Sequence, residues 1–292
     1  MKLSQFYKQA IKFGASRDPR KNKSAIKSYP DSAILYGGPD TEVKKILVGI
    51  DIEAAELLLA DRIRQHEGLD LVLSHHPEGR AWATFYEVMR LQVDMLAQVG
   101  VDRKVADELV TERMREVERR VLANNHSRST DVARLLDMPF MCLHTPADNH
   151  VSYFIHTLMN KEKPKRVEDI VGILKEVPEY NKATEGSTGP RIILGNPKRP
   201  AGKIFVEMTG GTEGSREVFD KLYKLGIRTL VSMHLSEDHF KKVKDADLNV
   251  VIAGHISSDT LGLNLLLDRI ESRAGESFDI ISCSGFMRVK RN

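Results

Sequence analysis

The segment from residue 45 to residue 77 constrains the fold more than any other part of the chain. It contains the apolar run KILVGID, a helical pattern in EAAELLLADRIRQHEG that ends at Gly68, and a second apolar run, LDLVLSHHP. Strand, helix and strand in this order are typical of a βαβ unit, and near-continuous apolar strands are typical of a parallel sheet covered on both faces. The segment therefore predicts an α/β protein with functional groups at the carboxyl ends of its strands.

The rest of the sequence extends this logic into two lobes. Residues 85–136 have a helical pattern, and MPFMCLHTP after them is typical of a third buried strand. Pro, Gly, Lys and Thr are enriched in residues 161–203, which we interpret as a linker or hairpin between an N-terminal α/β lobe, residues 1–160, and a C-terminal α/β lobe, residues 204–292. In the second lobe, KIFVEM, IRTLVSM and LNVVIAGH are expected to be strands, which predicts two α/β lobes with mainly parallel sheets.

Composition excludes several classes of protein. The chain has 44 Lys plus Arg and 41 Asp plus Glu, a net charge of +3 with interspersed signs, so we expect no nucleic-acid interface. No continuous apolar stretch is long enough for a membrane span or a signal sequence. Cys142 and Cys283 are the only cysteines and each lies in an apolar stretch, which favours the reducing cytoplasm over a disulfide framework.

Histidines recur at the ends of the apolar strands. Six of the ten histidines lie at or just past such an end: His75, His76, His144, His150, His234 and His255. A single one of them is more often a structural histidine than a ligand. Several imidazoles and carboxylates at the same edge of a sheet, however, can share a cation, and this combination suits zinc, manganese or iron.

Two short spacings indicate how such a site would be built. His75 and His76 are neighbours on an extended segment, so their side chains diverge and suit two neighbouring ions better than a single one. His255 and Asp259 are spaced i, i+4 at the start of a helical pattern, which places them on one face. The alternative for Asp259 is a favourable charge in the first turn, with Ser257 or Ser258 as a simple cap.

The motifs DLVLSHHP, HTPAD, MTGGTEGS and AGHISSD, after a leading KILVGID strand, resemble those of the Nif-three-like proteins, often labelled GTP cyclohydrolase I type 2 homologs. The resemblance runs over most of the chain. It implies a Nif-three-like fold with two divalent metal ions between the lobes, held by His75, His76, Asp148, His255 and Asp259. Asp259 stands where the family usually has glutamate, and Pro146-Ala147 replaces an Asn-Leu pair.

The resemblance also implies a function. We expect a dinuclear metal-dependent hydrolase or cyclohydrolase acting on a nucleotide-like or phosphorylated small molecule, with His144, His150 and Glu78 as orienting or proton-transfer groups. The alternative is a metal-binding interaction or regulatory protein without enzymatic activity. The family resemblance implies a toroidal homo-oligomer, a hexamer. The TGGTEGS turn is compatible either with a phosphate cradle or with a tight connection between a strand and a helix.

Overall fold

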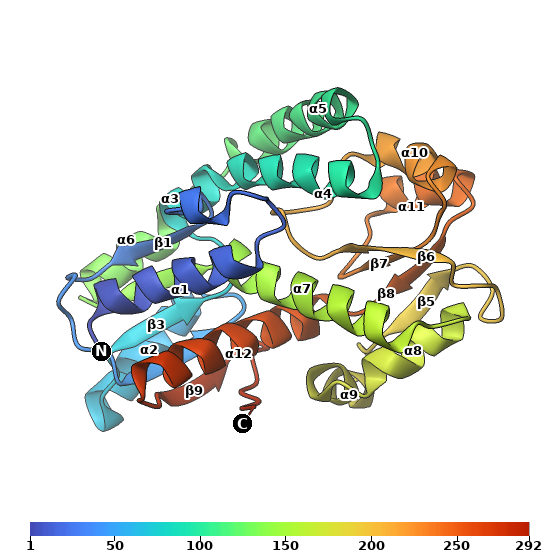
Figure 1. Cartoon of the computed structure of the whole chain (residues 1–292). Helices are drawn as coiled ribbons and strands as arrows, with labels where there is room; N and C mark the ends of the chain where they lie inside the picture. The colour runs from blue at the N-terminus through green and yellow to red at the C-terminus, as the bar shows by residue number, and fades with distance from the viewer. Residues whose placement is uncertain (292) are drawn as a thin grey trace.

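A computed structural model of the chain describes residues 1–291 and contains two sheets joined by shared helices (Figure 1). The first sheet has the strand order β1-β4-β3-β2-β9. Its strands are β1 (Ser32–Tyr36), β2 (Lys45–Gly49), β3 (Leu71–Ser74), β4 (Phe140–Leu143) and β9 (Asp279–Cys283). Only β1 is antiparallel to its neighbour, and the other four strands are parallel.

Alternating side chains of the first sheet pack against helices on both faces, as expected for parallel strands. Ile46 and Val48 face one group of helices, whereas Leu47 faces the other. The first group comprises α1 (Leu3–Arg17), α7 (Thr145–Glu162) and α12 (His255–Ala274). The second comprises α2 (Ala54–Glu67) and α6 (Arg128–Leu135).

The second sheet has the strand order β5-β8-β7-β6. Its strands are β5 (Arg191–Leu194), β6 (Lys203–Glu207), β7 (Ile227–Ser232) and β8 (Asn249–Ile252). Here β5 is the antiparallel strand, and the remaining three are parallel. One face packs on the C-terminal part of α7 and on α8 (Val167–Lys175) and α9 (Pro178–Glu185).

The other face of the second sheet is covered by helices from two distant parts of the sequence. They are η2 (Phe85–Arg90), α4 (Leu91–Val99), α5 (Arg103–Val121), η3 (Arg216–Val218), α10 (Phe219–Lys224) and α11 (Glu237–Asp245). The short elements α3 (Gly79–Ala83) and η1 (Lys23–Ala25) complete the chain. Because α4 and α5 lie before the predicted boundary at residue 160, the two lobes exchange helices.

The predicted architecture of two lobes with mainly parallel sheets is confirmed, and all six expected strands are present. The sheets do not follow the predicted boundaries, however. Residues 161–203 form α8, α9 and β5 instead of a hairpin, and β5 and β6 lie at opposite edges of their sheet. Strand β9, which belongs to the predicted C-terminal segment, pairs with β2 in the first sheet.

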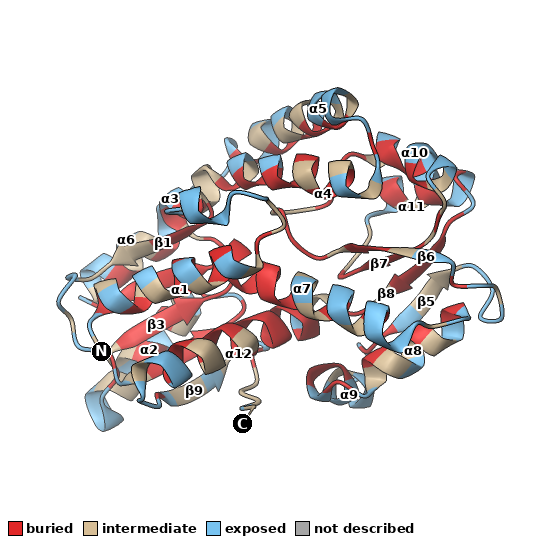
Figure 2. Ribbon diagram, in the orientation of Figure 1, coloured by how far each residue is buried: buried red, intermediate tan, exposed pale blue. Residues whose placement is uncertain are grey.

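Helix α7 links the two sheets. Its residue Ala147 packs in the core of the first sheet, whereas Val151, Ile155 and Met159 pack in the core of the second. The starts of α7 and α12 lie together in the middle of the molecule and are mostly buried (Figure 2). The site described next is built on these two helix starts. In residues 1–291, no helix is long and apolar enough to cross a membrane.

Candidate metal centre

The end of β3 presents two neighbouring histidines to the same cluster. The backbone N–H groups of His75 and His76 donate to Gly49 and Ile50 at 2.9 Å each, so the segment stays extended past Ser74. The Ser74 hydroxyl donates to the carbonyl of His76 at 2.8 Å, which fixes the turn that follows. His75 is completely buried, whereas the side chain of His76 is 24% exposed. The predicted divergence of the two side chains is not found, because the ring centroids are 5.3 Å apart and both Nε2 atoms face Asp259.

Each of the two helix starts carries a histidine and an aspartate at i, i+4. His144 is the N-cap residue of α7 and Asp148 lies in its first turn. His255 opens α12, and Asp259 lies one turn further on. The helices approach closely at this point, because a Cβ atom on Gly262 of α12 would lie 2.6 Å from the carbonyl oxygen of Ala147 in α7. A larger residue at position 262 would separate the two starts.

Asp259 lies at the middle of the site. Its Oδ1 atom is 3.5 Å from His75 Nε2, and that nitrogen is 3.4 Å from Asp148 Oδ1. Its Oδ2 atom is 3.5 Å from His76 Nε2 and 3.6 Å from His255 Nε2. The two oxygens of one carboxylate therefore face two different groups of ligand atoms.

These distances fit metal coordination better than hydrogen bonding. In residues 1–291, His75 Nε2, Asp148 Oδ1 and Asp259 Oδ2 are buried and have no hydrogen-bond partner. Two ligand atoms that each lie about 2.1 Å from a tetrahedral zinc ion are about 3.4 Å apart, which is close to the separations at this site. Buried polar atoms without partners are costly, so the ligand set is suited to divalent cations.

The outer nitrogen of each first-lobe histidine in the cluster contacts an oxygen that orients the ring. His75 Nδ1 lies 3.2 Å from the carbonyl of Leu143, and His76 Nδ1 lies 2.6 Å from Asp51. His144 Nδ1 lies 2.8 Å from the buried Asp31. Carboxylates and carbonyls commonly hold metal-binding histidines in this way, with Nε2 directed at the ion.

His144 belongs to the cluster and not only to its surroundings. Its Nε2 atom is 3.7 Å from Asp148 Oδ2, and its ligand atom lies within 4.8 Å of those of His75 and His76. The sequence had suggested His144 only as an orienting or proton-transfer group. Geometry makes it a sixth candidate ligand, because its other nitrogen is already held by Asp31.

The charges within the cluster shift the pKa values of its members. Burial alone would lower the pKa of His75, but Asp259 and Asp148 raise it to about 10. For Asp259 burial acts in the opposite direction and would raise the pKa, but His75 and His76 hold the pKa below its usual range. For His255 burial prevails and lowers the pKa to about 4. The carboxylates at the site thus attract positive charge strongly.

A second polar group adjoins the cluster in the second lobe. The rings of His234 and His255 are 4.6 Å apart between centroids. Glu213 lies 3.6 Å from His234 Nδ1 and 3.3 Å from His239 Nδ1, and it also accepts from the backbone N–H of Ser236. Burial would raise the pKa of Glu213, but His234 and Ser236 hold it at about 2. The result is an ionised carboxylate beside the candidate metal centre.

The TGGTEGS turn supplies this carboxylate and is held in place by α4. Gln92 donates to the carbonyls of Gly210 and Thr212, both at 2.7 Å, so the turn packs on a helix. A tight connection explains its glycines, which the sequence had left open between a connection and a phosphate cradle. The signal that could have identified Glu213 is its position as the one acidic residue of a glycine-rich turn that follows a strand.

Two other candidates lie outside the cluster. His150 is buried on α7 and lines a different cavity, together with Arg269. Glu78 is bonded to the Ser129 hydroxyl and is not within the groups of possible ligands. By contrast, all five predicted ligands lie together. Asp259 does not behave as a surface charge of the first turn, because it is 1% exposed and faces three histidines.

Fold and site together define an α/β protein of two lobes with a cluster of histidines and aspartates between them that can hold metal. Comparison with solved structures agrees with this class. A NIF3 superfamily protein from Sphaerobacter thermophilus matches with a TM-score of 0.79 and 27% sequence identity, over 95% of this chain and 97% of that chain. The chain is thus similar to NIF3 superfamily proteins in sequence and fold, which confirms the resemblance that the motifs indicated.

More distant structures share the fold. Reduced HcgD from Methanocaldococcus jannaschii has a TM-score of 0.56 at 17% identity, over 97% of both chains. The protein ybgI, described as of unknown function, has a TM-score of 0.56 at 14% identity, over 97% of this chain and 98% of that chain. Comparisons with models of protein families and with curated proteins found no match.

Proposed function

We propose that the chain binds two divalent metal ions, zinc, manganese or iron, with Asp259 as the residue that both ions share. The observation that carries this proposal is the placement of the two oxygens of Asp259. Oδ1 faces His75 and Asp148, whereas Oδ2 faces His76 and His255. His144 completes the first group through its Nε2 atom.

We further propose that this centre serves a hydrolase or cyclohydrolase that acts on a nucleotide-like or phosphorylated small molecule. A pair of bound divalent cations lowers the pKa of water towards neutrality and polarises a phosphoryl or carbonyl oxygen. The chain's own residues have defined tasks in this scheme. Asp31 and Asp51 orient His144 and His76, and the starts of α7 and α12 hold both aspartates rigidly.

His234 is the group best placed to contact a substrate. Its side chain is 42% exposed, it adjoins His255, and Glu213 lies beside its Nδ1 atom. Burial opposes the protonated form, but Glu213 is the stronger influence and raises the pKa of His234 above its usual range. A protonated His234 can donate to an anionic substrate or return a proton to a leaving group.

Two measurements test the proposal in order. Elemental analysis of purified protein should find about two equivalents of a transition metal per chain, removable with a chelator. Metal-loaded protein should then hydrolyse nucleoside triphosphates or simple phosphoesters, and Asp259→Asn should abolish this activity. A metal-loaded protein without turnover, in which His75→Ala still alters binding of a protein partner, would support the alternative of a metal-binding interaction protein.

We also propose a homo-oligomer, on the basis of the family resemblance. Light scattering should give a mass several times that of the chain, with six chains as the specific expectation. A single-chain mass would contradict it.

A further inference from the structure

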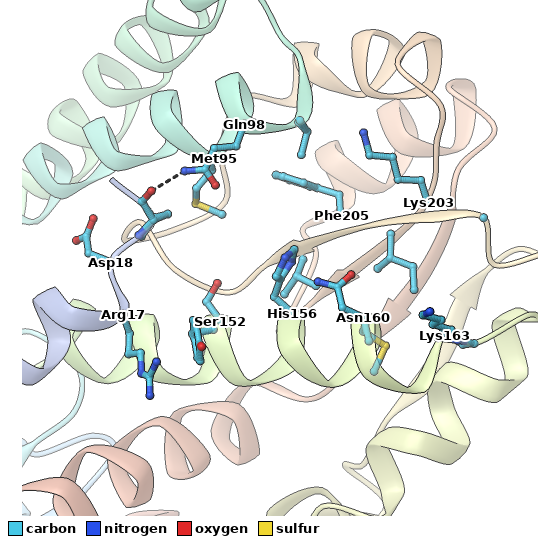
Figure 3. Close-up of a pocket in the computed structure, with 18 of the residues that line it drawn as sticks. Arg17, Asp18, Met95, Gln98, Ser152, His156, Asn160, Lys163, Lys203 and Phe205 are labelled. Atoms are coloured by element: carbon cyan, nitrogen blue, oxygen red, sulfur yellow. Dashed lines mark hydrogen bonds between the residues drawn. The ribbon is translucent and has the colours of Figure 1, made fainter. Parts of the chain in front are cut away.

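A cavity of about 720 Å³ lies between the two lobes, and none of the candidate metal ligands lines it. It is bounded by α4 on one side, α7 on the other and β6 between them (Figure 3). The C-terminal end of α1 and the segment that follows close a further side. Its size is in the range of pockets that hold small organic ligands.

One wall of the cavity is apolar. Met95 of α4 and Phe205 of β6 extend toward each other across the space (Figure 3), and Val99 and Ile204 also line the cavity. β6 is the last strand of its sheet, so one edge of its backbone has no strand partner in the part of the chain that the structure describes. This wall suits the flat apolar body of a ligand, with backbone groups at its rim.

The polar part of the lining is strongly basic. Arg17, Lys23, Lys163 and Lys203 come from four separate segments, and His156 of α7 extends into the cavity (Figure 3). Within residues 1–291, none of these four cations has a carboxylate within ion-pair distance. Lys23 donates to the carbonyl of Ser16, and the Arg17 guanidinium stacks on Tyr153 with its carbon 4.0 Å from the ring centroid.

The only carboxylate in the lining is already matched. Asp18 is completely buried and accepts two hydrogen bonds from Arg20, both at 2.8 Å. It also accepts from the Tyr29 hydroxyl at 2.8 Å and from Asn149 at 3.2 Å. The positive charge around the cavity is therefore left without a counterion from the described residues.

We propose that this cavity is a second ligand site, separate from the metal centre, for a small molecule that joins a phosphoryl group to an apolar body. A phosphoryl group carries close to two negative charges and three acceptor oxygens, which suits several separate ammonium groups. A carboxylate would be better served by a free guanidinium fork, and Arg17 is occupied by Tyr153.

The walls on several sides of the cavity favour a small molecule over an added peptide strand. A strand pairing with the edge of β6 would have to run past both ends of the cavity. One end is blocked, because the Gln98 side chain of α4 donates to the carbonyl of Pro19 at 2.5 Å (Figure 3). A compact ligand can bind without extending past either end of the cavity.

The test uses phenyl phosphate and isothermal titration calorimetry on the full chain. The parent protein carries Asp259→Asn and is treated with chelator, so the metal centre contributes nothing to binding. We expect one saturable site whose affinity falls with added salt, and no binding of phenol. Lys163→Gln and Lys203→Gln should each weaken binding roughly tenfold, the loss of one hydrogen bond between charged groups.

Two further variants separate charge from shape. Ser152→Phe, on the face of α7 that lines the cavity, should block binding without a change of charge. Lys221→Gln, on the exposed side of α10, should bind like the parent. The proposal is overturned if phenyl phosphate does not saturate up to about 10 mM, or if the Lys163 and Lys203 variants match Lys221→Gln. Since the parent lacks a working metal centre, failure of the proposed hydrolase would not affect this outcome.

Discussion

The two lobes are built on the same plan but contribute differently to the site. In each, an antiparallel edge strand, β1 or β5, pairs with the strand that leads into the central helix, β4 or β8. Strands β4 and β8 are each followed by a histidine and an aspartate at i, i+4, at the starts of α7 and α12. The neighbouring strands, β3 and β7, also end alike. Ser74 donates to the carbonyl of His76, and Ser232 donates to that of His234.

The difference lies after β3 and β7. The first lobe has two histidines there, His75 and His76, and both face the cluster. The second lobe has Met233, which is buried, and then His234, which faces Glu213. The first lobe thus supplies four of the six candidate ligands, and the second supplies His255 and Asp259, with His234 and Glu213 beside them.

The largest expected effect comes from the one carboxylate that serves both ligand groups. Asp259→Asn keeps the size of the side chain but removes its charge and one of its two oxygens. Because changes outside the ligand shell alone cost about 10–100-fold in metal affinity, we expect at least a 100-fold loss and almost no retained metal. Elemental analysis measures this directly.

The matched control is the counterpart on the other helix. Asp148→Asn should lose one ion and retain the ion near His76 and His255, because Asp148 faces only the first group. Asp259→Glu should keep both ions, since glutamate is the usual residue of the family that the sequence resembles. Full metal content in Asp259→Asn would show that this aspartate is not a ligand.

The second prediction concerns the contact between the lobes. Ions held jointly by α7 and α12 stabilise only the assembled arrangement, so chelation should lower the melting temperature. At a free metal concentration of about 1,000 times Kd the stabilisation is about 4 kcal/mol, and each kcal/mol shifts the melting temperature by about 2–4 °C in a protein of this size. We therefore expect a fall of roughly 10 °C by calorimetry, and no fall in Asp259→Asn.

The sequence was sufficient for the central strands of both sheets and for the edge strand β6, but not for β1, β5 and β9. The six predicted strands are apolar runs that lie inside the sheets or lead into the site. Strands β1, β5 and β9 are half-exposed edges, and β9 has the polar residues Asp279 and Ser282 within five positions. An edge strand is fixed by the neighbour with which it pairs, and this information is not local.

The same distinction holds for the site. Local patterns placed histidines and aspartates at strand ends and helix starts, whereas the choice of these five ligands came from the family resemblance. Asp31 had no such signal, because it precedes the unpredicted strand β1 and only tertiary structure brings it to His144. Glu213 was missed because it lies in a glycine-rich turn and its partners, on α11 and just after β7, are distant in the sequence.

The third prediction compares His144 of the first lobe, a candidate ligand, with His234 of the second lobe, which faces Glu213. His144→Ala should lower metal affinity by about 10–100-fold, because His144 faces the first group of ligands. His234→Ala should retain both ions, yet should reduce kcat by about 100-fold or more if His234 exchanges a proton with the substrate. Metal content and turnover, measured on the same samples, separate these roles. Loss of metal in the His234 variant would place it among the ligands instead.

The smallest expected effect is a stability change confined to one lobe, at Glu213. Its pKa in the folded protein is about 2, below the ordinary value of 4.5, because His234 and Ser236 outweigh the effect of burial. A carboxyl whose pKa is lowered by folding adds stability above its unfolded pKa and loses that contribution as the pH falls. For Glu213 the contribution is complete above about pH 5 and disappears between there and about pH 2.

Glu213→Gln should therefore be less stable than the unsubstituted protein at pH 7, by roughly 1–3 kcal/mol, and the difference should shrink as the pH is lowered toward 2. Denaturant unfolding of chelated protein at a series of pH values measures it without any contribution from metal. Glu237→Gln provides the control, because Glu237 is exposed on α11 and has no ion-pair partner within residues 1–291. A difference that stayed constant down to pH 2 would mean that Glu213 acts through its shape and not its charge.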